Sequence, residues 1–197
     1  MPTPDRIDSH TAGDPASRLG MADLEARLAQ LTASPRDLSS ISLLVRRGEG
    51  GLRDVIVSGR LSAEAGLVGD EWVRKAERSP DAQLTMMEFQ VAQLIANGQS
   101  LGLFGDQLFA GLDLSRENLP AGSQLEVGAA VIEVTGRPHN GCQKFRSRFG
   151  ADALRFVSRP DLRPRNFRGI YLRVLRDGGV AVGDSVTVTH RPEEDPS

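Results

Sequence analysis

The amino-acid sequence predicts a mainly β chain with a few short helices, of the α+β class, folded as a barrel or a sandwich. From Leu101 onward, glycines separate short apolar runs spaced about eight to twelve residues apart, which is typical of strands joined by tight turns. Two β-rich runs also flank the glycines of residues 48–51, as in a hairpin. The 197 residues suffice for one domain with one core.

The first forty residues are expected to lie outside this β domain. Residues 1–20 carry few apolar side chains and predict a disordered arm. Leu24, Leu28 and Leu31 then recur at helical spacing and predict a short helix, followed by a linker to residue 40. The β domain is expected over residues 41–190, and residues 191–197 form an acidic tail.

The elements of the β domain follow from the period of its apolar residues. A helix is expected over residues 88–96, ended by Asn97 and Gly98. Two short helices broken near Gly150 are expected over residues 142–158, with their phenylalanines in the core. Residues 159–169 predict an exposed basic loop, and residues 170–190 a final hairpin that turns at 177–179. Further strands are expected at residues 41–47, 52–61, 83–87, 124–127 and 130–135.

The charges are distributed unevenly along the chain. The net charge is only −2, but residues 137–176 contain eleven cations and two acids and carry +9, which leaves −11 on the remainder. Arginine supplies 22 of the 24 cationic side chains, a bias that coding composition alone can produce. A basic segment on an acidic body indicates an anionic ligand.

Several classes of protein are disfavoured. No apolar run is long enough for a membrane span and the first twenty residues do not resemble a signal peptide, so we expect a cytoplasmic protein with no membrane partner. A single cysteine allows no internal disulfide. Neither a phosphate-binding loop ending in Lys-Ser or Lys-Thr nor a dinucleotide-binding glycine motif is present.

Cys142 and His139 are the candidate catalytic residues. They lie in a segment that follows a strand and opens a helix, and a helix N-terminus attracts anions and stabilises a thiolate. Cys142, with cationic residues nearby, is either a nucleophile or soft-metal ligand or a small core residue. His139 is either an acid/base group or a capping residue. A protease-like set of Cys142, His139 and Asn140 is disfavoured, because residues so close in sequence do not easily reach the relay geometry.

Nucleic acid is a minority alternative. The basic segment interleaves arginines with five aromatic residues, as single-strand-binding grooves do. Three of these, Phe145, Phe149 and Phe156, recur at helical spacing and are expected in the core, which leaves the arginines on solvated faces.

An ordered set of motifs resembles the MOSC domain, named after the C-terminal domain of molybdenum cofactor sulfurase. The set covers about residues 43–189 and is specific as a group. Its first part is Gly66-Leu-Val-Gly-Asp-Glu-Trp72, and its last is the run from Arg168 to Val186. Between them stand Leu119-Pro-Ala-Gly-Ser-Gln-Leu-Glu-Val-Gly128, Glu133-Val-Thr-Gly-Arg-Pro-His-Asn-Gly-Cys142, Lys144-Phe145 and Arg148-Phe-Gly150.

The resemblance implies a closed or partly open β-barrel that handles sulfur and the molybdenum cofactor. The family cysteine proposed to carry sulfur or to bind molybdenum corresponds to Cys142. The cofactor is a pterin with a phosphate and dithiolene sulfurs, so a site for it needs cationic donors and can use a thiolate. The resulting candidates for holding it are Arg137, Asn140, Lys144, Arg146, Arg165 and Arg168.

The resemblance also implies partners and limits. A cysteine desulfurase or a molybdoenzyme is the expected protein partner, and pyridoxal phosphate is not expected on this chain, because the desulfurase domain is absent from it. Gly105-Asp-Gln-Leu108 stands where relatives often have Gly-Glu-Asn-Leu, and Ser79-Pro-Asp-Ala82 where many have His-Gly-Gly. We therefore expect a small stand-alone branch, with catalysis left open. The alternative is a non-catalytic module that binds an anionic ligand.

Overall fold

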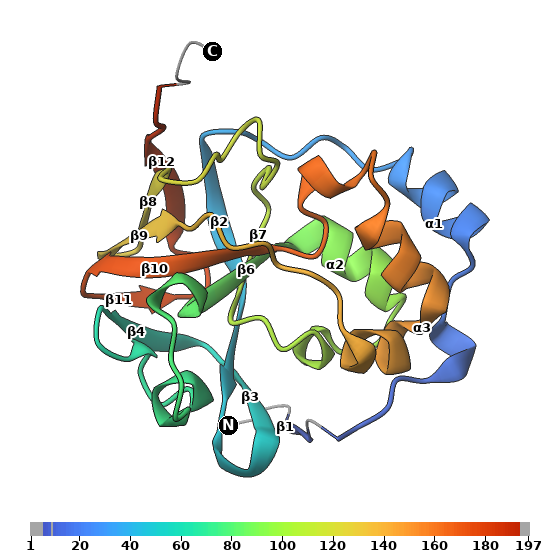
Figure 1. Cartoon of the computed structure of the whole chain (residues 1–197), viewed down its shortest axis with the longest axis horizontal. Helices are drawn as coiled ribbons and strands as arrows, with labels where there is room; N and C mark the ends of the chain where they lie inside the picture. The colour runs from blue at the N-terminus through green and yellow to red at the C-terminus, as the bar shows by residue number, and fades with distance from the viewer. Residues whose placement is uncertain (1–5, 9, 194–197) are drawn as a thin grey trace.

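The computed structural model describes residues 6–8 and 10–193, and its central feature is a closed barrel of seven strands (Figure 1). Strand β7 pairs with β2 and closes the ring, and the β6–β7 pair is parallel whereas the other barrel pairs are antiparallel. The mainly β, α+β prediction is therefore confirmed, with a closed mixed barrel. In pairing order the strands are β2 (Leu38–Arg47), β12 (Ser185–His190), β8 (Gln124–Val127), β9 (Ala130–Val134), β10 (Ile170–Arg176), β6 (Leu84–Glu88) and β7 (Leu108–Ala110).

Five further strands extend or accompany the barrel. Strand β3 (Leu52–Ile56) continues the sheet from β2, and β1 (Arg6–Asp8) pairs with β3. A separate three-stranded sheet contains β4 (Ser58–Ser62), β5 (Gly66–Leu67) and β11 (Gly178–Ala181).

Three α-helices lie together on one side of the barrel (Figure 1). They are α1 (Met21–Leu28), α2 (Phe89–Ala96) and α3 (Gln143–Ser158). As expected, α2 ends at Asn97, which adopts a left-handed conformation, and Gly150 breaks α3 with φ +96°. No helix in the described part of the chain is long and apolar enough to cross a membrane.

Two hydrophobic clusters form the core. Alternate residues of β9 point into the barrel, where Ala130, Ile132 and Val134 are buried. The second cluster fills the space between the barrel and the helices. It includes Phe145 and Phe149, whose rings lie 5.1 Å apart, so the expectation that these residues belong to the core is confirmed.

The predicted final hairpin over residues 170–190 is wrong. Strand β10 pairs with β9 and β6, β12 pairs with β2 and β8, and the expected turn at Gly178 begins β11, which pairs with β4. Gly178 packs against the backbone of Ala129, where a side chain would collide. The apolar patterns of β10, β11 and β12 are compatible with pairing to each other or to distant strands. In this protein they pair with distant strands, which closes the barrel.

The N-terminal arm differs from its expected disorder wherever it is described. Residues 6–8 form β1, the backbone N–H of Asp14 donates to Gln99 at 2.8 Å, and the Arg18 side chain donates to the Ser147 carbonyl at 2.7 Å. These contacts order the arm through hydrogen bonds, which its shortage of apolar residues did not reveal. Residues 1–5 and 9 lie outside the described part.

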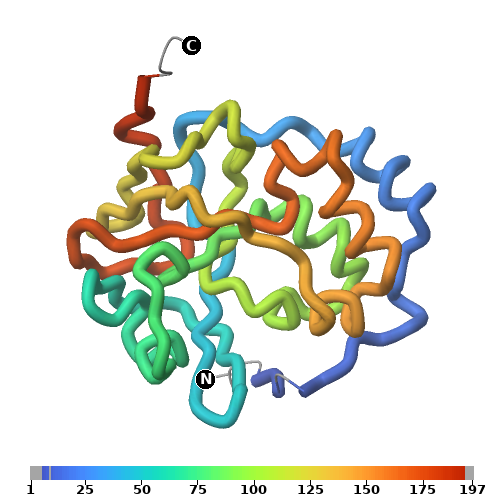
Figure 2. Tube along the Cα trace, viewed as in Figure 1, coloured from blue at the N-terminus to red at the C-terminus, as the bar shows by residue number. Residues whose placement is uncertain are grey.

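The expected basic loop of residues 159–169 is exposed at first and buried at its end. Figure 2 follows the chain from β9 through α3 and back across this loop into β10. Phe167 is 1% and Arg168 8% exposed. The loop therefore delivers one arginine to the interior.

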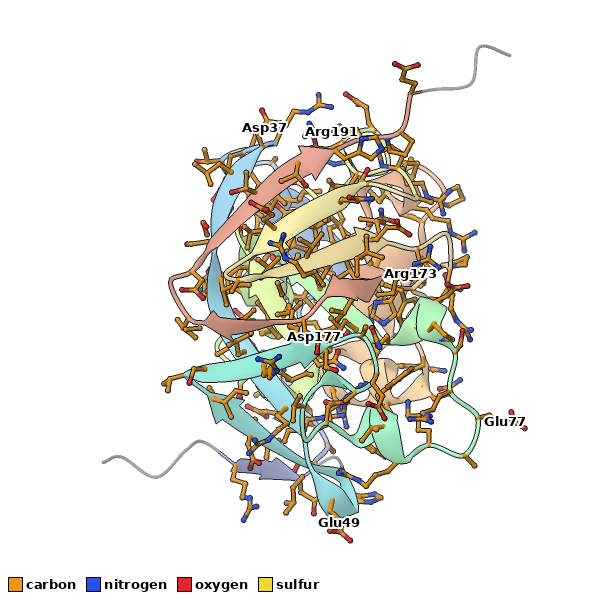
Figure 3. All side chains as sticks on the ribbon, turned by 90° about the vertical axis from the view of Figure 1, so that its left-hand side faces the viewer. Asp37, Glu49, Glu77, Arg173, Asp177 and Arg191 are labelled. Atoms are coloured by element: carbon orange, nitrogen blue, oxygen red, sulfur yellow. The ribbon has the colours of Figure 1, made fainter. Side chains whose placement is uncertain are left out.

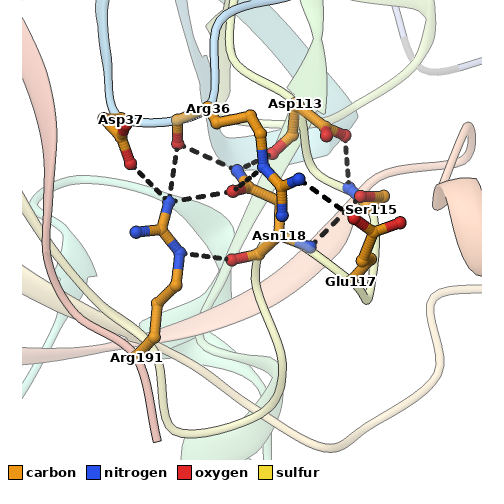
Figure 4. Close-up of polar contacts among 7 residues, drawn as sticks. All are labelled: Arg36, Asp37, Asp113, Ser115, Glu117, Asn118 and Arg191. Carbon is orange, nitrogen blue, oxygen red and sulfur yellow. Dashed lines mark hydrogen bonds and ion pairs between the residues drawn. The ribbon is translucent and has the colours of Figure 1, made fainter.

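Hydrogen bonds around Asn118 join three distant segments (Figure 4). The buried Asn118 amide donates to the carbonyls of Arg36 and Asp113, and Arg191 donates to the Asn118 carbonyl at 2.7 Å and to Asp37 at 2.8 Å. The start of the expected acidic tail is thus attached to the barrel. Residues 194–197 are outside the described part.

Candidate functional site

The connection from β9 to α3 presents Cys142 at the surface. Its carbonyl accepts the Arg146 N–H at 3.0 Å and so begins α3, while its side chain is exposed and makes no capping hydrogen bond. The thiol is therefore available to a ligand, and the core alternative for Cys142 is wrong. The upstream end of the connection is held by Thr135, whose N–H donates to the Tyr171 carbonyl at 3.0 Å.

Cys142 lines a pocket of about 470 Å³, called here the Cys142 pocket. The volume falls in the range of about 300–1,000 Å³ that is usual for small-molecule sites. Its lining includes two acids, Glu71 and Glu77. Seven cationic residues also line it: Arg47, Arg53, Lys75, Arg137, Lys144, Arg148 and Arg168.

Two buried carboxylates form ion pairs with two of these cationic residues. Asp70 accepts from the Arg47 guanidinium at 2.6 Å, and Asp106 accepts from Arg168 at 2.6 Å. Burial opposes the charge of Arg47, but the hydrogen bonds and charge of Asp70 raise the pKa of Arg47 overall. Gly105 has φ +79°, and a side chain there would meet the Arg53 guanidinium at 2.9 Å.

Arg53 forms no ion pair with the described residues, and it shares a backbone acceptor with Arg148. Both donate to the Leu103 carbonyl, at 3.4 and 2.6 Å. Burial, with the nearby charges of Arg148 and Arg47, lowers the pKa of Arg53 to about 10. Burial also lowers the pKa of Arg148, which the proximity of Arg168 reinforces and that of Cys142 opposes. The pocket thus holds neighbouring cations that repel one another.

His139 lies between the ring of Tyr171, 4.4 Å away between centroids, and the carboxylate of Asp106. Its Nδ1 is 3.6 Å from Asp106 Oδ1, and within the described structure each of these two buried atoms lacks a hydrogen-bond partner. Burial and the charge of Arg168 lower the pKa of His139 to about 3, against the effect of Asp106. His139 is therefore a neutral imidazole at physiological pH.

The structure places the site residues predicted from the sequence in different pockets. Cys142, His139, Arg137, Lys144 and Arg168 share the Cys142 pocket. Asn140 lines an adjoining pocket, Arg146 lines a shallow hollow with Arg18, and the Arg165 guanidinium lies 5.2 Å from the centroid of the Phe167 ring. Neither Arg146 nor Arg165 is among the residues that line the Cys142 pocket.

Sequence reasoning missed several residues of this pocket. Arg47 and Arg53 come from β2 and β3, more than eighty residues before Cys142, and no local motif distinguishes them. Asp70 and Asp106 each follow a glycine, a pattern that is typical of exposed turns, yet both are fully buried. The run Gly105-Asp-Gln-Leu108 was the available signal, because it stands where the family has a recurring turn.

Comparison with known proteins identifies the family. The MOSC domain model matches residues 90–187, which include the connection that carries Cys142. The chain belongs to the MOSC domain family. No curated protein matches the sequence of this MOSC protein.

Solved structures share the fold of this MOSC protein. YiiM from Escherichia coli is 20% identical, with a TM-score of 0.55, over 79% of this chain and 72% of that chain. YuaD from Bacillus subtilis is 14% identical, with a TM-score of 0.51, over 76% and 94% of the two chains. Among residues 6–8 and 10–193, no cluster of three or more His, Cys, Asp or Glu side chains is arranged to hold a metal ion.

Proposed function

We propose that this MOSC protein binds the molybdenum cofactor in the Cys142 pocket, with Cys142 as the thiolate that contacts the metal or accepts sulfur. The observation that carries the proposal is the concentration of seven cationic residues around one exposed thiol. Membership of a family associated with this cofactor supports it.

The residues present fit the two chemical demands of the cofactor. Its phosphate needs cationic donors, and Arg53, which forms no ion pair with the described residues, provides positive charge in the pocket. A phosphate would relieve the repulsion that contributes to the low pKa of Arg53. Its metal favours soft ligands, and Cys142 offers a sulfur ligand in the same pocket. When bound, the cofactor supplies redox chemistry at molybdenum.

The side chains that line the pocket have different roles in this proposal. Arg137 and Lys144 are exposed at the rim, where they attract an anion, whereas Arg53 and Arg148 lie deeper. His139, a neutral imidazole beside Tyr171 and Asp106, can contact the bound molecule without adding positive charge.

Sulfur transfer is the second role open to Cys142. Its exposed thiol, once it has lost its proton, can attack the outer sulfur of a persulfide on a cysteine desulfurase, so that a new S–S bond forms on Cys142 and the thiolate of the partner leaves. A molybdoenzyme is then the protein that receives the sulfur or the loaded cofactor.

Cofactor content tests the proposal. We expect wild-type protein from cells that make the cofactor to copurify with molybdenum and with a pterin that fluoresces after oxidation. Cys142→Ser should lose most of the molybdenum if the thiolate binds the metal, while Arg155→Gln, outside the pocket, should retain both. Copurification of neither component would contradict cofactor binding.

The release of thiocyanate by cyanide distinguishes the two roles proposed for Cys142. After incubation with a cysteine desulfurase and cysteine, a sulfur carrier should release thiocyanate with cyanide, and Cys142→Ser should not. Equal release from both proteins would exclude the carrier role.

Tight, salt-dependent binding of single-stranded DNA, with no pterin bound, would favour the nucleic-acid alternative instead.

A further inference from the structure

A second pocket adjoins the Cys142 pocket and has no role in the proposed function. It measures about 460 Å³ and is called here the Arg163 pocket. Arg137, His139 and Arg168 line both pockets, so these three residues form the wall between them. Asn140, singled out in the sequence, belongs to the Arg163 pocket.

Among the described residues, the positive charge of the Arg163 pocket is compensated only at Arg168. Its lining includes Arg116, Arg137, Arg163 and Arg168 but no Asp or Glu. Arg168 is paired with Asp106, whereas the side chains of Arg116, Arg137 and Arg163 make no ion pair with the described residues. Three exposed guanidinium groups without counter-charges match a dianion better than a single negative charge.

Apolar side chains form another part of the lining, beside the polar residues Thr135, His139, Asn140 and Asn166. Leu119, Val134, Val157 and Ile170 are each less than 7% exposed and border the pocket, together with Pro120 and Pro138. Such a surface favours an organic group attached to the anion over a fully hydrated inorganic ion.

The two loops that build this pocket are tied to each other. The backbone N–H of Arg116 donates to the Pro164 carbonyl at 2.8 Å, and the Asn166 amide donates to the Leu114 carbonyl at 2.8 Å. The first loop is also held by the Asn118 hydrogen bonds (Figure 4). The pocket is therefore assembled by the protein itself, so little ordering is needed on binding.

We propose that the Arg163 pocket binds an organic phosphate monoester, with the phosphate between Arg116, Arg137 and Arg163 and the ester group against Leu119 and Val157. This site is separate from the one proposed for the molybdenum cofactor and does not depend on it. Its shared wall places a bound ester next to His139, which also faces the Cys142 pocket.

Phenyl phosphate is a suitable probe, because it joins a dianion to a flat apolar group. We expect saturable binding to the full chain by calorimetry at low ionic strength, and weaker binding of both inorganic phosphate and benzoate. Arg116→Gln and Arg163→Gln should each weaken phenyl phosphate binding at least about tenfold, the loss expected for one charge-assisted hydrogen bond. Arg155→Gln, exposed on α3 and paired with Asp152, is the matched control and should bind like wild type.

Amide chemical shifts locate the probe. Binding in the Arg163 pocket should shift the amides of Ala121, Gly136 and Gly169, which line only this pocket, more than those of Gly105 and Lys144, which line only the other. Lys144→Gln should leave the affinity for phenyl phosphate unchanged. Thermal unfolding of each variant confirms that it is folded.

Three results would overturn the proposal. The first is no saturable binding of phenyl phosphate, and the second is binding of benzoate as tight as that of the phosphate ester. The third is a loss of affinity in Lys144→Gln but not in Arg163→Gln, which would place the anion in the Cys142 pocket. That third result would leave the cofactor proposal standing, so the two proposals fail separately.

Discussion

The ion-paired arginines on the outer face of the barrel and Arg53 of the Cys142 pocket have different electrostatic surroundings. On the outer face of the barrel, Arg173 pairs with Glu133 and Asp81, and Arg176 pairs with Glu126. Figure 3 shows Arg173 among the polar side chains of this face. In the Cys142 pocket, Arg53 faces other cations instead. The difference shows that the sum of charges along the sequence does not distinguish ion-paired arginines from unpaired ones.

The pKa values of Arg159 and Arg53 are shifted in opposite directions. Hydrogen bonds from Arg159 to Asp161 and Glu25 raise the pKa of Arg159, although burial slightly opposes this. Burial and neighbouring cations lower the pKa of Arg53. An anion bound in the pocket would give Arg53 the counter-charge that Arg159 already has.

The largest effect is expected at the buried ion pair behind the pocket. Asp106→Asn leaves the charge of Arg168 buried without its carboxylate, and the free energy of unfolding should fall by about 3–5 kcal/mol. Urea denaturation measures the change. Asp177→Asn, whose carboxylate lies 3.8 Å from Arg60 at the surface, is the control and should change little. A loss below about 1 kcal/mol in Asp106→Asn would show that this pair does not support the pocket.

A pH-dependent effect is expected from His139, whose pKa is about 3 in the folded protein and 6.5 as the ordinary value. Between these values the unfolded chain binds the extra proton, so stability falls as the pH drops below 6.5. The slope from this residue should approach about 1.4 kcal/mol per pH unit.

Comparison of wild type with His139→Gln isolates this contribution. Urea denaturation at pH 7 and pH 5 should show a smaller loss of stability in the variant. Equal losses would mean that His139 is protonated in the folded state, and its surroundings would then differ from those described for the pocket.

The smallest effect is expected at the exterior pairs. Arg173→Ala should lower the free energy of unfolding by less than about 1 kcal/mol, because the side chain is 44% exposed and solvent screens its ion pairs. Thermal or urea unfolding checks this. A loss as large as that of Asp106→Asn would erase the distinction between the exterior and the pocket.

Local patterns predicted much of the fold. Glycine spacing and alternating apolar residues located β8 and β9, and helical spacing located α2 and both parts of α3. The pairing of β11 with β4 was missed because those strands are more than a hundred residues apart and neither carries a register signal. The order of the N-terminal arm was missed because it rests on hydrogen bonds to α2 and α3.

The candidate site was predictable only where it is contiguous in sequence. His139, Cys142 and Lys144 lie in one connection, and the family resemblance covers that connection. Arg53 reaches the pocket from β3 through the space left by Gly105, a contact that depends on how the barrel closes. The net charge of residues 137–176 also counted the ion-paired arginines of the exterior together with the arginines that line the pockets.

The central claim is that the cations of the Cys142 pocket, Arg53 among them, hold the phosphate of a pterin cofactor. The most direct test is the pterin and molybdenum content of Arg53→Gln and Arg173→Gln, both purified from cells that make the cofactor and both confirmed as folded. We expect Arg53→Gln to lose most of both components and Arg173→Gln to match wild type. Equal content in the two variants would contradict the claim, as would wild-type protein that carries neither component.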